Sequence, residues 1–378
     1  MTAIDRRTFL LGSAGYSLAA LMACAPETGH QARLLSGFQS LGKQGRKYGV
    51  AAIDLNGRLR FSLTLPQRLH QIITLPASHP GQSRECLAVA RRPGTELYHI
   101  DVDRGQLLNT IRSPGNRHFF GHASCVEQGD YIVVPQNHLD EKASSIGIYD
   151  RKEAWALIDE IPLPTVGPHQ LECLSDGKTL VVAMGGIHTH PESGRKKLNI
   201  DSMQSSLLYL DSGSGKVLDD FRPPDPKLSL RHLAITSDDH VIVGAQYQGD
   251  GETIWPLAYS HKGESSLQAL SASQEVWRLH QQYIGSVSVE VGVESARFAY
   301  LSSPRGGVVS RWDLHSGECI EHRDIRDACG VAFSNVQHGF FISNGAGQML
   351  KSEQNTGQVK ALAYQQGIIW DNHLSFIM

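Results

Sequence analysis

The stretch from Gly167 to Ala183, GPHQLECLSDGKTLVVA, contains two short apolar strands separated by a Ser-Asp-Gly turn. Asp and Gly favour tight hairpin turns, so this stretch predicts a β-hairpin. A third strand follows at 205–221, SSLLYLDSGSGKVLDDF, and ends in an Asp-x-x-x-Gly turn. The result is a small antiparallel sheet that begins, unusually, with a titratable side chain, His169.

The same unit recurs along the chain. Complete copies begin at Glu85, His122, His169, His232, Gly285 and Ala328. Repetition at a period of about 40 to 50 residues is typical of propellers and other repeat architectures. A seventh copy is split, because KYGVAAIDLNGRLRFSLTLP (from Lys47) has only outer strands and the C-terminal WDNHLSFIM is a lone first strand.

Joining these two pieces closes a ring and removes exposed sheet edges. We therefore predict an all-β fold, a seven-bladed β-propeller whose ring is closed by the C-terminal strand in the first blade. The alternative is an irregular β-sandwich. We expect a single propeller domain over 47–378 with an insertion at about 186–206, preceded by a polar leader over 25–46.

Composition limits the function classes. The chain has 378 residues with 40% hydrophobic composition, enough for a large closed β domain. Its 35 basic and 38 acidic residues nearly balance, which does not suggest nucleic-acid binding. The 18 histidines are the one anomaly. The motifs GxSxG, Walker A, HExxH and the EF-hand loop do not occur, and Asp150, Asp211 and Asp313 are interpreted as turn-forming residues.

The N-terminus is interpreted as a targeting segment. Residues 1–24 contain Arg6 and Arg7 before a short apolar run, as in a twin-arginine signal peptide, and end in LMAC, which resembles a lipobox. The apolar run is too short for a comfortable membrane span. We expect export to the periplasm as a lipoprotein attached to the membrane only through a lipid on Cys24. Cleavage after Ala-Cys-Ala, giving a soluble periplasmic protein, is the alternative.

The first residues of the repeats suggest a site. In a propeller the first strand of each blade lines the central channel, so these residues converge at one mouth. Neutral imidazole is a common ligand of iron, copper, zinc and nickel. We therefore predict a metal site formed by four histidines, with a carboxylate as a candidate fifth ligand: His122, His169, His232, His373 and Glu85. Hydrogen-bonded core histidines are the alternative.

Two further groups surround this site. His118, Arg231 and Asn372 are positioned to orient the ligand rings. The insertion GGIHTHPESGRKKLNIDSMQSS is far longer than a hairpin needs, and long loops in compact domains are often functional. It offers His188, His190 and Arg195 as a lid or as ligand contributors, although a solvated loop would explain the same charges.

Several pieces of the chain carry a family resemblance. VGPHQLEC, GGIHTHP-x-x-GR-x-KLN, RHLAI and WDNH resemble a family of twin-arginine-exported proteins classified as a domain of unknown function and assigned to quinoprotein-amine-dehydrogenase-like propellers. The resemblance covers nearly all of the mature chain, and the chain departs from it at HASCVEQGD, where Gly more often follows the His. A looser similarity is to nitrous-oxide reductase, a propeller with a histidine-bound copper cluster on its axis, but its second copper domain is missing here.

The resemblance implies a role. Members of the family tend to be encoded beside imelysin-type iron-binding lipoproteins and a dihaem oxidoreductase, which implies periplasmic iron acquisition with these proteins as candidate partners. We therefore predict a periplasmic metal-binding propeller, with iron favoured and copper as the second candidate. One alternative is a metal-dependent oxidoreductase with an open coordination position. The other is a metal-free interaction scaffold, and fold alone does not decide among them.

Overall fold

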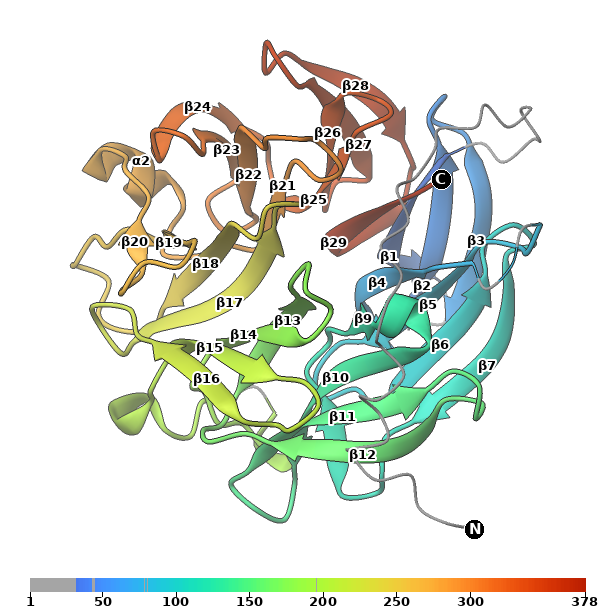
Figure 1. Cartoon of the computed structure of the whole chain (residues 1–378). Helices are drawn as coiled ribbons and strands as arrows, with labels where there is room; N and C mark the ends of the chain where they lie inside the picture. Colours follow the sequence, from blue (N-terminus) through green and yellow to red (C-terminus); the bar gives the residue numbers. More distant parts are fainter. Residues whose placement is uncertain (1–31, 43–44, 78, 80, 195) are drawn as a thin grey trace.

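Seven four- or five-stranded antiparallel sheets surround a central axis (Figure 1). The computed structural model describes residues 32–378 except 43–44, 78, 80 and 195. The predicted seven-bladed β-propeller is confirmed. The twin-arginine pair, Cys24 and Arg195 lie outside the described residues. None of the described helices is long and apolar enough to cross a membrane.

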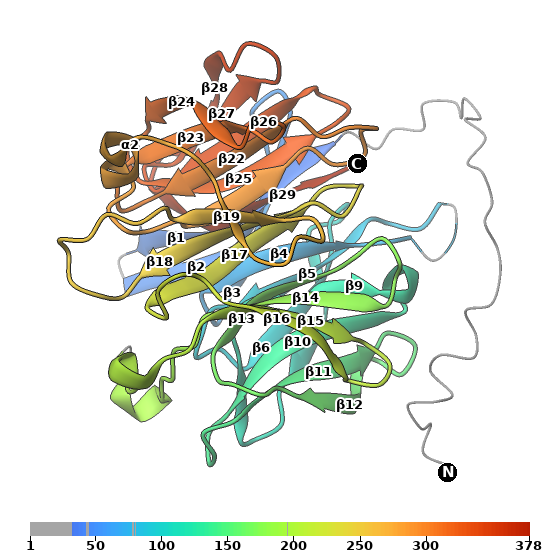
Figure 2. The same ribbon diagram turned by 60° about the vertical axis from the view of Figure 1, so that its left-hand side comes forward.

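The blades follow one another in chain order around the ring (Figure 1), and Figure 2 shows the same blades turned by 60°. Innermost strand first, the first three blades are β29 (Ile368–Ile377), β1 (Arg33–Gly42), β2 (Gly45–Asp54), β3 (Leu59–Leu65); β4 (Leu69–Leu75), β5 (Glu85–Ala90), β6 (Glu96–Asp101), β7 (Gln106–Arg112); and β8 (Arg117–Phe119) with β9 (Ser124–Val126), β10 (Tyr131–His138), β11 (Ser144–Asp150), β12 (Ala156–Pro162).

The other four blades have the same order of strands. They are β13 (Pro168–Cys173), β14 (Thr179–Met184), β15 (Ser206–Asp211), β16 (Val217–Phe221); β17 (Leu228–Ile235), β18 (Val241–Tyr247), β19 (Ala258–His261), β20 (Gln268–Ala269); β21 (Ser286–Val289), β22 (Phe298–Ser303), β23 (Val308–Asp313), β24 (Glu318–Asp324); and β25 (Ala328–Ser334), β26 (Gly339–Asn344), β27 (Gln348–Glu353), β28 (Val359–Tyr364). Helix α2 (Gln274–Leu279) precedes the sixth blade.

Burial explains the composition of each blade. The second strand, such as β5, packs against neighbouring blades on both faces and is almost wholly buried and apolar. The outermost strand, such as β7, exposes most of its side chains. The Asp turns are structural as predicted: the Asp211 carboxylate accepts from the Ser214 backbone N–H at 2.6 Å, and Gly215 closes the turn with φ +69°.

The ring closes between the two ends of the chain. Strand β29 pairs with β1 along most of its length, from Arg33 opposite Ile377. Arg68, which precedes β4, donates from Nε to the buried Asp371 carboxylate of β29 at 2.6 Å and so links the first two blades.

Two predictions about the strands were wrong. The first blade begins at Arg33, inside the expected polar leader, because β1 is a full strand of that blade. The unit that begins at Glu85 does not begin a blade, because Glu85 starts β5, the second strand. The innermost strand of the second blade is β4, which carries His70.

Candidate metal centre

Five histidines form a closed ring of side chains on the propeller axis. They come from the innermost segments of five consecutive blades: His373, His70, His122, His169 and His232. Successive ring centroids, including the pair that closes the circle, are 4.6–4.9 Å apart. All five side chains are buried, with at most 8% of their surface exposed. In the two remaining blades, Ser286 begins β21 with its Oγ 3.5 Å from His373 Nδ1, and Cys329 lies where the β25 ladder shifts between Ala328 and Val331.

Irregular pairing of the innermost strands places these rings. The ladder of β4 shifts between Leu69 and Ile72, which flank His70, and the ladder of β13 shifts between Pro168 and Leu171, which flank His169. The ladders of β17 and β29 are interrupted next to His232 and His373, and His122 lies between β8 and β9. Bulges of this kind redirect side chains and are common beside functional sites.

Glycine makes room for the ring. Gly121 has φ +105°, and a Cβ there would lie 2.6 Å from Cδ2 of His70. A Cβ at Gly330 would lie 2.5 Å from the backbone nitrogen of Leu374, next to His373. Any larger residue at either place would displace a ring or its backbone.

Four of the five histidines have the arrangement of a metal site. One ring nitrogen from each of His70, His122, His232 and His373 lies within 4.8 Å of the others. Opposite ligands of an ion with bonds of about 2.0–2.1 Å are about 4 Å apart, so small side-chain adjustments suffice. Each of the four also has one buried ring nitrogen without a hydrogen-bond partner among the described residues. Such groups are costly to bury, so this cluster is a strong candidate for a bound cation.

The surroundings keep the imidazoles neutral. Burial lowers the pKa of His70, His122, His169 and His232 well below the usual value, and that of His373 to about 3. The positive charges of Arg91 and Arg231 act in the same direction. A neutral imidazole has a free lone pair, which is the form that binds metals.

Glutamines in two of the innermost strands form hydrogen bonds with the next blade. Gln71 Oε1 accepts from Nδ1 of His122 and from the Ala123 backbone, both at 3.1 Å. Gln170 makes the corresponding contact two blades later, with the backbone of Leu233. Since Nδ1 of His122 donates to Gln71, its Nε2 carries the lone pair and is free for a metal.

His169 has a different environment from the other four. The Arg231 guanidinium donates to its Nδ1 at 3.3 Å and to Ser229 Oγ at 2.9 Å. A guanidinium is only a donor, so the neutral His169 ring accepts at Nδ1 and carries its proton on Nε2. The four convergent nitrogens include that of His70, where the prediction had His169. The His169 ring instead accepts a hydrogen bond from Arg231.

Glu85 lies in a different place from the one predicted. Its carboxylate binds His99 Nε2 at 2.8 Å and Arg151 at 2.7 Å, and Trp155 Nε1 donates to the other nitrogen of His99 at 3.2 Å. This network joins the second and third blades through β5, β6 and the turn after β11. It contains no residue of the five-histidine ring.

The other predicted site residues are not members of the five-histidine ring, and each has its own local contacts. His118 is buried in β8 and hydrogen-bonded to the Phe119 carbonyl and to Asn137. Asn372 is buried in β29 next to His373. His190 caps a short 3-10 helix through Glu192, and His188 is half-buried in the insertion, where its backbone binds Asn199 at 2.7 Å.

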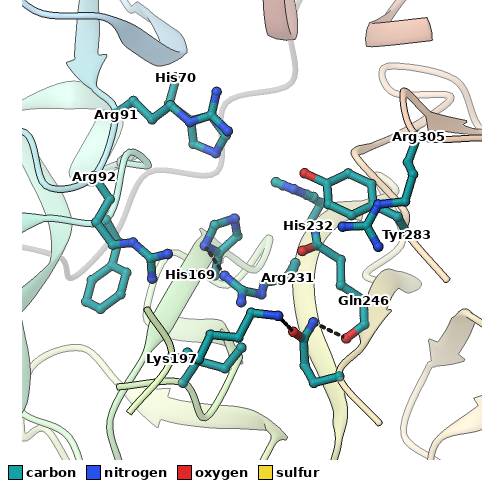
Figure 3. Close-up of a pocket in the computed structure, with 13 residues that line it drawn as sticks. His70, Arg91, Arg92, His169, Lys197, Arg231, His232, Gln246, Tyr283 and Arg305 are labelled. Atoms are coloured by element: carbon teal, nitrogen blue, oxygen red, sulfur yellow. Dashed lines mark hydrogen bonds between the residues drawn. The ribbon is translucent and has the colours of Figure 1, made fainter. Parts of the chain in front are cut away.

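Two pockets are in contact with the ring. The first, of about 140 Å³, is lined by His70, His169 and His232 (Figure 3). Ile187 and Lys197 of the insertion form part of its wall. The second, of about 490 Å³, is lined by the residues that follow three of the histidines and by His373 itself. Histidines of the ring therefore line both pockets.

The residue that the sequence analysis missed is His70. The signal that identifies it is the pair His70-Gln71 in LHQI, which repeats His169-Gln170 in PHQL. Both glutamines make the same contact with the next blade, so the repeated pair marks equivalent positions.

Comparison with known proteins identifies a family without a described function. No curated protein matches the chain. The model of the family described as "Protein of unknown function (DUF1513)" matches residues 63–377, from β3 to the end of β29, and includes all five histidines of the ring. The chain belongs to this family.

Proposed function

We propose that the protein binds one transition-metal ion in the histidine ring. The observation that carries this proposal is the convergence of four buried histidines, each with a ring nitrogen that has no hydrogen-bond partner among the described residues. Leaving one buried polar group unpaired costs about 1–3 kcal/mol. A single cation satisfies all four nitrogens at once.

The donor atoms of the site limit which metals it would bind. Imidazole suits zinc, copper, iron and nickel, and affinity among divalent ions is greatest for copper. Glu85 is bound elsewhere, so the site loses the carboxylate that would have favoured iron. The nitrogen-only set supports copper, while the family resemblance supports iron, and these two ions are the candidates.

The biological role that we propose is metal acquisition outside the cytoplasm. It rests on the family resemblance, with its imelysin-type and dihaem neighbours as candidate partners, and on the twin-arginine motif and lipobox at Cys24. The buried site supports storage or handling of a metal, because the five histidine side chains are at most 8% exposed.

A second candidate is a metal-dependent oxidoreductase. The observation that favours it is the pocket of about 140 Å³, which touches His70 and His232 and so gives a small molecule access to a bound metal. A metal with an open position can exchange electrons with a substrate there.

Metal content tests the proposal. The protein is purified without nickel affinity or chelators, analysed for metals, and titrated with iron, copper and zinc. The test variant is His70→Ala/His232→Ala. The matched control is His188→Ala/His190→Ala, which removes two histidines of the insertion. We expect about one metal per chain in the wild type and the control, and none in the test variant.

Two results would overturn the proposal: a wild type that takes up none of these ions, or a test variant that binds as the wild type does. The histidines would then be structural, and the scaffold function would lead. If metal binds, oxidation of a small reductant by O₂ that is lost in the test variant would favour the oxidoreductase.

A further inference from the structure

The smaller pocket at the ring, of about 140 Å³, has an unusual lining. Thirteen residues surround it, and five of them are cationic: Arg91, Arg92, Lys197, Arg231 and Arg305. None of the residues described as lining it is Asp or Glu. These five come from the second, fourth, fifth and sixth blades, so the ring of blades brings charges together that are far apart in the sequence.

Several of these cations are held in fixed orientations. Arg231 is only 7% exposed and is bound to Ser229 and His169. The Arg92 guanidinium lies over the Phe120 ring at 5.8 Å, and that of Arg305 lies over Tyr283 at 4.8 Å. A guanidinium that is fixed in this way loses little entropy when it binds a carboxylate or phosphate through two parallel bonds.

Neutral donors complete the lining. His169 carries its proton on Nε2, because Arg231 donates to Nδ1. Lys197 binds Gln248, whose amide nitrogen donates to the Gln246 backbone at 2.8 Å. Figure 3 shows Arg92, Arg231 and Lys197 around the same opening as His169.

The charge has a direct consequence. Several like charges at the wall of a concave site raise the local potential, and low-dielectric surroundings strengthen it. A metal ion in the adjacent ring would add to this potential. The pocket of about 140 Å³ is well below the roughly 300–1,000 Å³ of sites for drug-sized ligands, so a ligand that fits it is compact.

We propose that this pocket binds a compact oxyanion with two or more negative charges, a small polycarboxylate or phosphate. Arg92, Arg231 and Arg305 hold its oxygens, and its inner end faces the histidine ring. Only the contact between the anion and a metal rests on the proposed function. Binding of the anion itself does not, because the cationic residues line the pocket whether or not a metal is bound. A polycarboxylate would bring a chelated metal to the site, whereas phosphate would act as a co-ligand.

Calorimetric titration of the metal-free protein with citrate and with inorganic phosphate tests the proposal. Acetate, which has one charge, serves as the weak-binding comparison. The variants are Arg92→Gln and Arg305→Gln. Arg278→Gln, on exposed helix α2, is the matched control outside the pocket. Thermal melting checks that each variant is folded.

We expect the wild type to bind citrate or phosphate more tightly than acetate. Each pocket variant should lose about tenfold or more in affinity, as expected for a lost charge-assisted bond, and Arg278→Gln should lose nothing. Tighter citrate binding identifies the polycarboxylate, and tighter phosphate binding identifies the co-ligand. Absence of binding of both anions to the wild type would overturn the proposal. So would folded Arg92→Gln and Arg305→Gln variants that bind the anion as tightly as the wild type does.

Metal titration of the same proteins separates the two proposals. If Arg92→Gln and the wild type bind metal equally but the wild type binds no anion, only the anion proposal fails. If the wild type binds the anion but no metal, only the metal site fails.

Discussion

Gln71 Oε1 and His122 Nδ1 lie 3.1 Å apart across the boundary between the second and third blades. This bond sets the tautomer of His122 and leaves Nε2 free. Outer-shell bonds of this kind change metal affinity by about 10–100-fold when they are removed. Gln71→Leu should therefore weaken metal binding by that factor, as measured by competition with a chelating dye.

Gln170→Leu is the matched control for this prediction. Gln170 bonds the backbone of Leu233 and no histidine ring, so its loss should lower the free energy of unfolding with a much smaller effect on metal affinity. Equal effects of the two variants on metal binding would contradict the tautomer argument.

Glu85 should contribute to the stability of the fold and not to metal affinity. Glu85→Gln weakens the charge-assisted bonds to His99 and Arg151, which are largely buried. We expect a loss of about 1–3 kcal/mol in the free energy of unfolding, measured by denaturant titration, with unchanged metal affinity. Exposed Glu318→Gln should change neither quantity. Weaker metal binding by the Glu85→Gln variant would contradict this prediction and would indicate that the Glu85 carboxylate is a metal ligand.

The ion pair between Arg68 and Asp371, which links the first two blades, should contribute more to the free energy of unfolding than a surface ion pair. Arg68→Met leaves the Asp371 carboxylate, 1% exposed, without its cation. We expect unfolding to become easier by about 2–4 kcal/mol, because breaking a buried pair strands a charge. Arg68→Met/Asp371→Leu should recover much of this loss, and a double variant as unstable as the single one would argue against the explanation.

Glu172 should make stability depend on pH. Its carboxylate accepts hydrogen bonds from the neutral side chains of Ser124 and Gln170, and burial raises its pKa to about 7. Between the unfolded pKa, about 4.3, and about 7, the folded state binds more protons, so this group lowers stability as pH rises through that window.

Glu172→Gln removes this effect. The variant should match or approach the wild type at pH 4, and should be more stable by about 1–3 kcal/mol at pH 8. Thermal unfolding at both pH values measures the difference. A stability difference that does not change with pH would show that Glu172 has the same pKa in the folded and unfolded states and would contradict the raised pKa.

The sequence predicted the ring of blades and most of the site for a physical reason. Repeats place equivalent residues on one axis, so His122, His169, His232 and His373 could be aligned without a structure. The prediction missed β4 because the first two strands of a blade are both buried between neighbouring blades and have similar apolar patterns. Strand β5 was therefore taken as innermost, and Glu85 took the place of His70.

The cationic pocket could not be predicted in this way. Its residues lie in loops and strand ends of different blades, such as Arg92, Lys197 and Arg305, and they do not repeat. Only the closed ring of blades brings them together. The neutral state of the histidines depends likewise on burial, which the sequence pattern does not measure.

The most direct test of the central claim is X-ray absorption spectroscopy of the protein loaded with one equivalent of copper or iron. The histidine ring predicts a first shell dominated by nitrogen at about 2.0–2.1 Å, with the outer scattering of about four imidazoles. A shell dominated by carboxylate or water oxygen would place the metal elsewhere and contradict the account.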